Sequence, residues 1–127
     1  MAHIHPSRVT SFRQARNDLV TLFQQQATFL RIDIDCRSYV IPCLRLQLVQ
    51  QLDIVADRSR KMAFYSRHSP YVLLHPAGFY ETTVPFHCAA LKGQCAYLAD
   101  RLRDNPCTDV PRAVARLIDQ IVANLPF

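Results

Sequence analysis

The chain is poor in glycine, with only two among its 127 residues. Glycine supplies the backbone freedom that tight turns and irregular loops need, so this scarcity argues against a fold dominated by loops. It also leaves no glycine-rich segment of the kind that cradles phosphate groups in nucleotide-binding enzymes. His87 directly precedes Cys88, but adjacent residues of a helix point about 100° apart, so the pair is weak evidence for a catalytic base and its nucleophile. We therefore expect a protein that is not an enzyme.

Long hydrophobic runs are missing as well. No apolar segment approaches the roughly 20 residues that a membrane-spanning helix needs. The first residues include Arg8, Arg13, Arg16 and Asp18 without a continuous apolar stretch, which is unlike a secretory signal. We therefore expect a cytoplasmic protein with no membrane partner.

Cysteine and histidine do not occur at the spacings that hold a structural metal ion. The five cysteines are an odd number, so a closed set of disulfides would leave one unpaired. Three pairs of potential ligands are each seven positions apart: Cys36 and Cys43, His68 and His75, and Cys88 and Cys95. Seven residues span about 10 Å of helix, which is too far for two ligands of one ion. We expect reduced thiols, no metal site and no cofactor.

Two aspartates offer an alternative to this expectation. Asp33 and Asp35 alternate with apolar residues, and two carboxylates on one face of a strand can hold a hard cation such as Mg²⁺. A polar face of an alternating strand is more often simply solvated. A metal-dependent enzyme is therefore the less favoured interpretation.

The strongest structural pattern lies between Pro85 and Phe127. Apolar residues there fall on two helix faces: Cys88, Leu91, Cys95, Leu98 and Leu102, and then Val110, Val114, Leu117, Ile121 and Leu125. A short polar break separates the two series, which predicts an antiparallel helix pair. Both thiols fall within the first apolar face, where they should pack as small hydrophobic groups. Gly93 is unusual inside a helix and indicates either a close helix approach or a break.

The remaining segments predict a mixed α+β fold. Helical spacing indicates helices from about Arg8 to Ala27 and from about Pro42 to Met62. Strict alternation in Leu30–Cys36 predicts a half-buried strand. Two β-rich runs at residues 71–74 and 79–84, separated by a Pro-Ala-Gly turn, predict a hairpin. We therefore expect a single domain over residues 1–127, dominated by about four helices with a small antiparallel sheet; the alternative is an all-α bundle.

The positive charge is concentrated in the first part of the chain. Residues 1–70 hold ten Lys and Arg against five Asp and Glu, whereas residues 71–127 hold five of each. The excess is densest at Arg58, Arg60, Lys61 and Arg67, which we call the basic segment. Such a segment favours an acidic protein surface or nucleic acid.

An excess of apolar residues points toward an interaction function. The residues expected at a partner interface are Leu22, Phe23, Leu117, Ile118, Ile121 and Val122. They make the apolar faces of the first and last helices wider than one neighbouring helix requires. We expect a homodimeric adaptor or antagonist that binds and modulates a regulatory protein with an acidic surface, for example by sequestering it. The alternative is a nucleic-acid-binding regulator that uses the basic segment.

Overall fold

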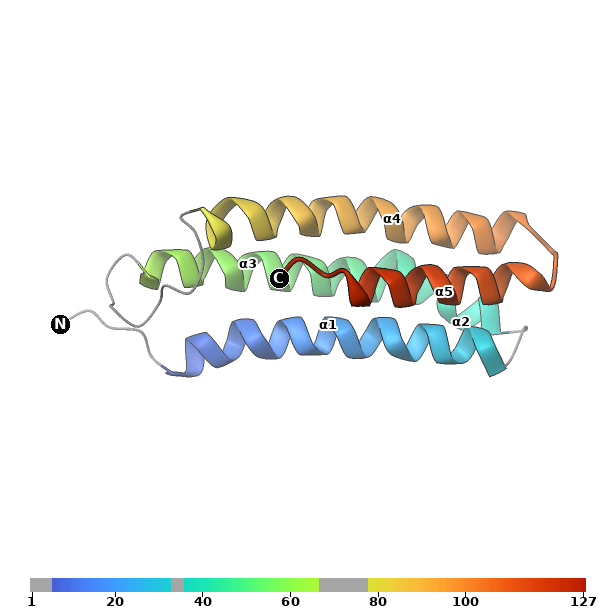
Figure 1. The fold of residues 1–127 in the computed structure, drawn as a ribbon, viewed down its shortest axis with the longest axis horizontal. Helices are drawn as coiled ribbons and strands as arrows, with labels where there is room; N and C mark the ends of the chain where they lie inside the picture. Colours follow the sequence, from blue (N-terminus) through green and yellow to red (C-terminus); the bar gives the residue numbers. More distant parts are fainter. Residues whose placement is uncertain (1–5, 33–35, 67–77) are drawn as a thin grey trace.

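The computed structural model describes residues 6–32, 36–66 and 78–127, and these form a bundle of four long helices (Figure 1). Its helices are α1 (Pro6–Ile32), α2 (Arg37–Pro42), α3 (Leu48–Ser66), α4 (Val84–Asp104) and α5 (Asp109–Ala123). Two π-helical turns, η2 (Cys43–Gln47) and η3 (Phe79–Thr83), precede α3 and α4. None of the described helices is long and apolar enough to cross a membrane.

The α+β prediction is wrong for the part of the chain that the structure describes, because it contains no strand. The all-α alternative is confirmed. Leu30 and Ile32, predicted in a strand, end α1. Leu30 is buried whereas Ile32 is 75% exposed, so the alternating apolar residues do not share a buried face. Leu30 instead continues the helical series of Leu19, Phe23 and Ala27, all of which face the core.

The predicted hairpin also gives way to helix. Residues 71–74 lie outside the described residues, but Phe79–Thr83 form η3. Gly78 has a φ of +84°, and its carbonyl oxygen accepts hydrogen bonds from the backbone N–H groups of Thr82 and Thr83 at 2.9 and 3.0 Å. Tyr80 packs edge-on against Phe12 of α1, with ring centres 5.5 Å apart. The left-handed glycine thus starts a helical turn where the sequence predicted a strand.

The helix predicted from Pro42 begins earlier than expected. The helical run starts at Arg37 and continues through Pro42 and η2 into α3. Proline lacks the N–H that a helix interior uses. The chain accommodates Pro42 by widening to π geometry directly after it, and the N–H of Leu48 bonds to the carbonyl of Cys43.

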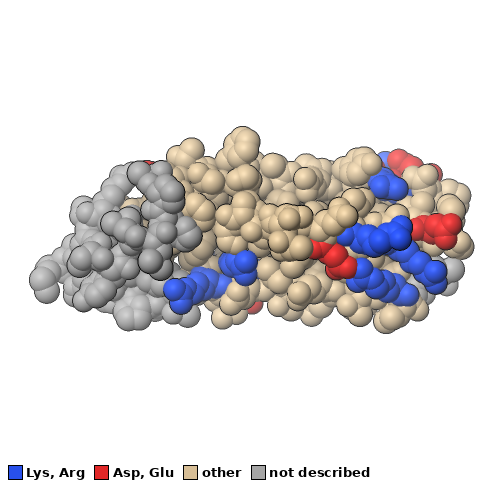
Figure 2. All heavy atoms as spheres, viewed as in Figure 1, with Lys and Arg blue, Asp and Glu red and all other residues tan. Residues whose placement is uncertain are grey.

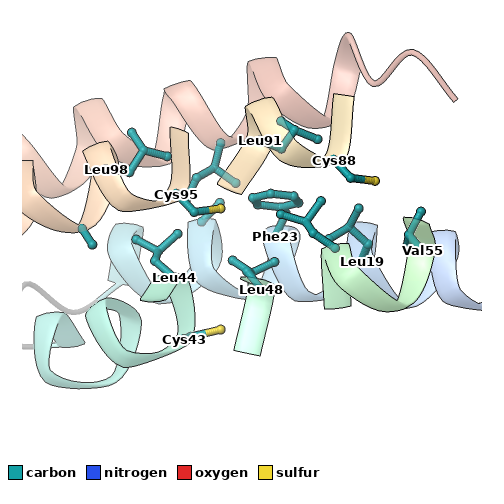
Figure 3. Packing of buried hydrophobic residues seen from close by; sticks show 14 of the residues in the cluster. Leu19, Phe23, Cys43, Leu44, Leu48, Val55, Cys88, Leu91, Cys95 and Leu98 are labelled. Atoms are coloured by element: carbon teal, nitrogen blue, oxygen red, sulfur yellow. The ribbon is translucent and has the colours of Figure 1, made fainter. Parts of the chain in front are cut away.

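The core lies along the axis of the bundle. It receives Leu19 and Phe23 from α1, Leu48 and Val55 from α3, and Cys95 from α4, all five completely buried. Figure 3 shows the side chains of Cys88 and Cys95 pointing from α4 into this core. The prediction that both thiols are packing groups is confirmed, because Cys88 and Cys95 are 1% and 0% exposed.

The helices pair unequally around the bundle. α1 packs extensively against α3 and α5, and α3 packs extensively against α4. α4 and α5 follow each other in the sequence and run in opposite directions (Figure 1), as predicted, yet they touch much less than the other neighbours. The bundle is therefore closed on three sides and open between α4 and α5.

Candidate protein-binding groove

The opening between α4 and α5 forms a groove of about 490 Å³. Its floor consists of Leu91 and Leu98 from α4 and of Leu117 and Ile121 from α5. Leu91 and Leu98 are buried, whereas Leu117 and Ile121 are half-buried. The groove is lined by His87, Ala90, Leu91, Gln94, Tyr97, Leu98, Leu117, Gln120, Ile121, Asn124, Leu125 and Pro126.

The groove exists because each of its two helices is anchored to a different neighbour. α5 turns Val114, Ala115 and Ile118 toward α1 and buries them completely. α4 commits Cys88 and Cys95 to the core beside α3. The residues that remain between α4 and α5 include the flanking apolar groups Leu91 and Leu98 of α4 and Leu117 and Ile121 of α5, which line the groove.

The lining of the groove is electrically neutral. None of the described residues that line it is Asp, Glu, Lys or Arg. The polar groups on its walls are the amides of Gln94, Gln120 and Asn124, the phenol of Tyr97 and the imidazole of His87. This arrangement combines an apolar floor with uncharged hydrogen-bonding walls, which suits an amphipathic helix rather than a charged metabolite.

Large aromatic side chains extend this apolar surface toward solvent. Tyr97 is 57% exposed although it lines the groove, and Phe86 near the start of α4 is 68% exposed. The ring of Phe86 stacks edge-on against His87, with centres 5.6 Å apart. Exposed aromatic groups beside a hydrophobic floor are typical of binding surfaces, because they bury much area at little entropic cost.

The structure divides the predicted interface residues into two groups. Phe23 and Ile118 are 0% exposed and belong to the core, so the prediction that they contact a partner is corrected. Leu22, Leu117, Ile121 and Val122 are half-buried. Of these, Leu117 and Ile121 line the groove. Two of the six residues predicted at a partner interface thus line the groove, and their contact with a partner stays a prediction.

The α4 wall was missed by the sequence analysis. Leu91 and Leu98 were assigned only to a helix pair, and Gln94 and Tyr97 were not considered. A usable signal was present, because Lys92 is the only charged residue between Val84 and Ala99. A surface helix that is nearly free of charge over four turns is unusual, since one face normally remains in water.

The described residues of the basic segment, Arg58, Arg60 and Lys61, lie toward the end of α3 and do not line the groove. Arg60 is exposed and makes no ion pair with a described residue. Lys61 pairs with Asp57 at 3.1 Å, and Arg58 lies 4.0 Å from the same carboxylate. Arg67 lies outside the described residues. Asp57 thus compensates part of the positive charge of the basic segment. This charge was the basis for predicting an acidic partner or nucleic acid.

The thiols of the core have no features of a reactive site. Burial raises the pKa of Cys43 and of Cys88 to about 11, and the pKa of Cys95 to about 12. The neutral thiol is therefore the stable form at physiological pH. Cys36 is also buried, and its thiol donates to the carbonyl of Phe29 at 3.0 Å. Cys107 is exposed.

Within the described ranges, no group of three or more His, Cys, Asp or Glu side chains is arranged to hold a metal ion. Asp33 and Asp35, as well as His68 and His75, lie outside these ranges. Comparisons with known protein families, curated proteins and solved structures gave no match for this chain.

Proposed function

We propose that this protein is a non-enzymatic interaction module that binds an amphipathic helix of a regulatory partner in the groove between α4 and α5. The observation that carries the proposal is the apolar floor of Leu91, Leu98, Leu117 and Ile121, left open between two helices that are each fixed to other neighbours. A helix supplies the complementary shape, because apolar residues at positions i, i+3, i+4 and i+7 form a ridge.

The neutral lining defines the chemistry of the bound face. A charged side chain pressed against this floor would lose its water without gaining an ion pair, which is costly. The amides of Gln94 and Gln120 can instead donate to or accept from uncharged polar groups beside the ridge. The bound face of the partner is therefore expected to be apolar, with Ser, Asn or Gln along its edges. Holding this face would sequester it from other contacts of the regulator.

Two neighbouring alanines permit a closely matched test. Ala89 and Ala90 are both exposed residues of α4, and only Ala90 lines the groove. Peptides of roughly 20 residues, long enough to form a helix of about 30 Å, would be selected from a display library on the wild-type protein. Their affinities would then be measured by fluorescence anisotropy for Ala90→Glu and Ala89→Glu.

Ala90→Glu is expected to weaken binding, because it places a carboxylate on the neutral wall beside the floor. Ala89→Glu adds the same charge to the same helix outside the groove and should leave binding unchanged. Equal melting temperatures for the two variants would show that folding is not the cause. Peptides that bind both variants equally well would contradict the proposed function.

The proposal includes the homodimer expected from the sequence. Exposed apolar residues outside the groove, among them Ile32 at 75% and Leu46 at 58% exposure, offer area for self-association. Light scattering across micromolar concentrations should give twice the chain mass of 14.6 kDa. A strict monomer over this range would remove the homodimer from the proposal and leave the groove untouched.

A further inference from the structure

The walls of the groove continue into arginine at the end where α4 and α5 are joined. On α5, Arg116 precedes the groove residue Gln120 by one turn. Arg112 precedes it by two turns and lies about 80° round the helix from it, on the side away from Leu117 and Ile121. On α4, Arg101 follows the groove residue Tyr97 by one turn, and its guanidinium carbon lies 6.0 Å from the centre of the Tyr97 ring. We call Arg101, Arg112 and Arg116 the rim arginines.

The rim arginines are not paired with acidic side chains of the described residues. Arg112 and Arg116 are exposed, and Arg101 is half-buried. Other arginines of the bundle differ, because Arg31 pairs with Asp119 and Arg45 pairs with Asp100.

Four acids lie within about one helical turn of the rim arginines, and two of them, Asp100 and Asp119, pair with Arg45 and Arg31. Asp104 accepts a hydrogen bond at 2.8 Å from Nε of Arg103. Asp109 occupies the first turn of α5, where the N-terminal end of the helix dipole stabilises a carboxylate. Figure 2 shows few charged atoms over most of α4, and Lys and Arg atoms toward the joined end of this face with a smaller number of Asp or Glu atoms among them. The groove is therefore neutral along its length and positive at one end.

We propose that the helix held in the groove carries acidic residues in its first turn, and that this turn lies against the rim arginines. The inference rests on the proposed function and specifies its partner. Acidic side chains at a helix N-terminus also stabilise that helix through its dipole, so an acidic first turn favours both folding and docking of the same segment. The bound helix then runs in the same direction as α5, with its last turn near His87.

The cations that attract the partner in this proposal differ from those that the sequence indicated. An acidic partner was expected from the sequence, but the attraction was assigned to Arg58, Arg60, Lys61 and Arg67. Of those residues, Arg58, Arg60 and Lys61 belong to the end of α3, and none of these three lines the groove, whereas Arg67 is outside the described residues. Arg101 and Arg116 instead lie one turn beyond the wall residues Tyr97 and Gln120, and Arg112 lies one turn further along α5, so these are the cations at the joined end of the groove.

Two triple charge reversals test the inference with matched net charge. The first is R101E/R112E/R116E, and the control is R58E/R60E/K61E in the basic segment. Display selection with the peptide library would be repeated on each variant and on the wild-type protein. The selected peptides would be sequenced, and their affinities measured by anisotropy at low and at physiological salt.

Peptides selected on the wild-type protein should be rich in Asp and Glu in the first turn before their apolar ridge. Reversal of the rim arginines should lower the affinity for these peptides by about tenfold, because three charge pairs at the surface together contribute about that factor. It should also remove most of the dependence of the affinity on salt. The control should change affinity by less than about threefold.

Three results would overturn the inference while leaving the proposed function intact. The selected peptides could bind in the groove without enrichment in Asp and Glu, or they could carry these acids in their last turn. Alternatively, their affinity could fall only for the control variant R58E/R60E/K61E. Each would still show sensitivity to Ala90→Glu. If instead the proposed function were wrong, the Ala90→Glu and Ala89→Glu variants would bind the peptides equally. This result distinguishes the two kinds of failure.

Discussion

At the scale of single residues, the cysteines show how environment decides chemistry. Cys43, Cys88 and Cys95 occupy the packed interior, and the pKa of each is raised because burial penalises the thiolate. Cys107 lies in the connection between α4 and α5 and is exposed. The spacing of apolar residues in the sequence correctly identified Cys88 and Cys95 as packing groups, because residues three and four positions apart lie on the same face of a helix.

Thiol labelling should separate these environments. At pH 8 an aromatic disulfide reagent is expected to modify Cys107 rapidly and the four buried thiols only when the protein unfolds. A Cys107→Ser variant should then show no rapid phase, which makes it the control. Two or more thiols reacting rapidly in the wild-type protein would contradict the assignment of the others to the core.

Alkaline pH should weaken the fold for the same reason. An unfolded thiol ionises near the ordinary pKa of 9.0, whereas the folded Cys95 thiol stays neutral until about pH 12. Protons are therefore lost first by the unfolded chain, and the free energy of unfolding falls as pH rises above 9. We expect a loss of about 1 kcal/mol for each of Cys43, Cys88 and Cys95 between pH 8 and pH 10, measured by urea titration. A Cys95→Ala variant should lose less over this interval.

The pattern of apolar residues could not separate a buried face from an exposed face where both faces of one helix are apolar. Phe23 and Ile118 were assigned to a partner interface together with Leu22 and Leu117, because all are large and hydrophobic. Only packing shows that Phe23 and Ile118 are completely buried while their neighbours are not. A sequence states hydrophobicity, whereas the rotation of each helix against its neighbours decides which hydrophobic residues remain accessible.

At the scale of elements, local alternation was overridden by helix propagation. The strand expected at Leu30–Cys36 depended on four residues, but α1 had already formed over six turns when it reached Leu30. Extending an existing helix adds one hydrogen bond for each residue fixed, while starting a strand needs a partner. The helices at the C-terminal end were predictable because their spacing persists over many turns, as in Cys88 to Leu102.

The two glycines differ in backbone conformation, because Gly93 is helical whereas Gly78 has a positive φ. Gly93 lies exposed inside α4 with no atom within 4 Å of an added Cβ, so it marks neither a break nor the close helix approach that its position indicated. Gly93→Ala should raise the free energy of unfolding by about 1 kcal/mol, because alanine loses less entropy in a helix. Urea titration measures the change.

Gly78→Ala is the matched counterpart, since it also adds one methyl group in open space. Its φ of +84° disfavours any side chain, and we expect a loss of roughly 1 kcal/mol from this strain. If both substitutions changed stability in the same direction, the explanation from backbone conformation would be wrong.

At the scale of the whole molecule, the bundle closes three of its four sides. Cross-element contacts of Arg31, Arg45 and Lys92 join α1 to α5, η2 to α4, and α4 to α3. Arg37 holds the connection between α4 and α5, donating to the carbonyl of Cys107 at 2.8 Å. These contacts fix α4 and α5 to the rest of the bundle without bringing them together, and the groove is the result.

The groove could not be located from the sequence because it depends on distances between helices that are adjacent along the chain. A short connection predicts that α4 and α5 are neighbours, and they are. It does not predict that α5 prefers α1 and that α4 prefers α3. The apolar residues that this preference leaves open, above all Leu117 and Ile121, are the part of the predicted interface that the structure supports as a candidate binding surface.

The affinity ratio between Ala90→Glu and Ala89→Glu tests the central claim most directly. Both variants carry the same new charge on adjacent exposed residues of α4, and only one of them alters the groove. For helical peptides selected on the wild-type protein, the account predicts that Ala90→Glu binds about tenfold more weakly than Ala89→Glu. Equal affinities in two equally stable variants would show that the groove between α4 and α5 does not bind the helix.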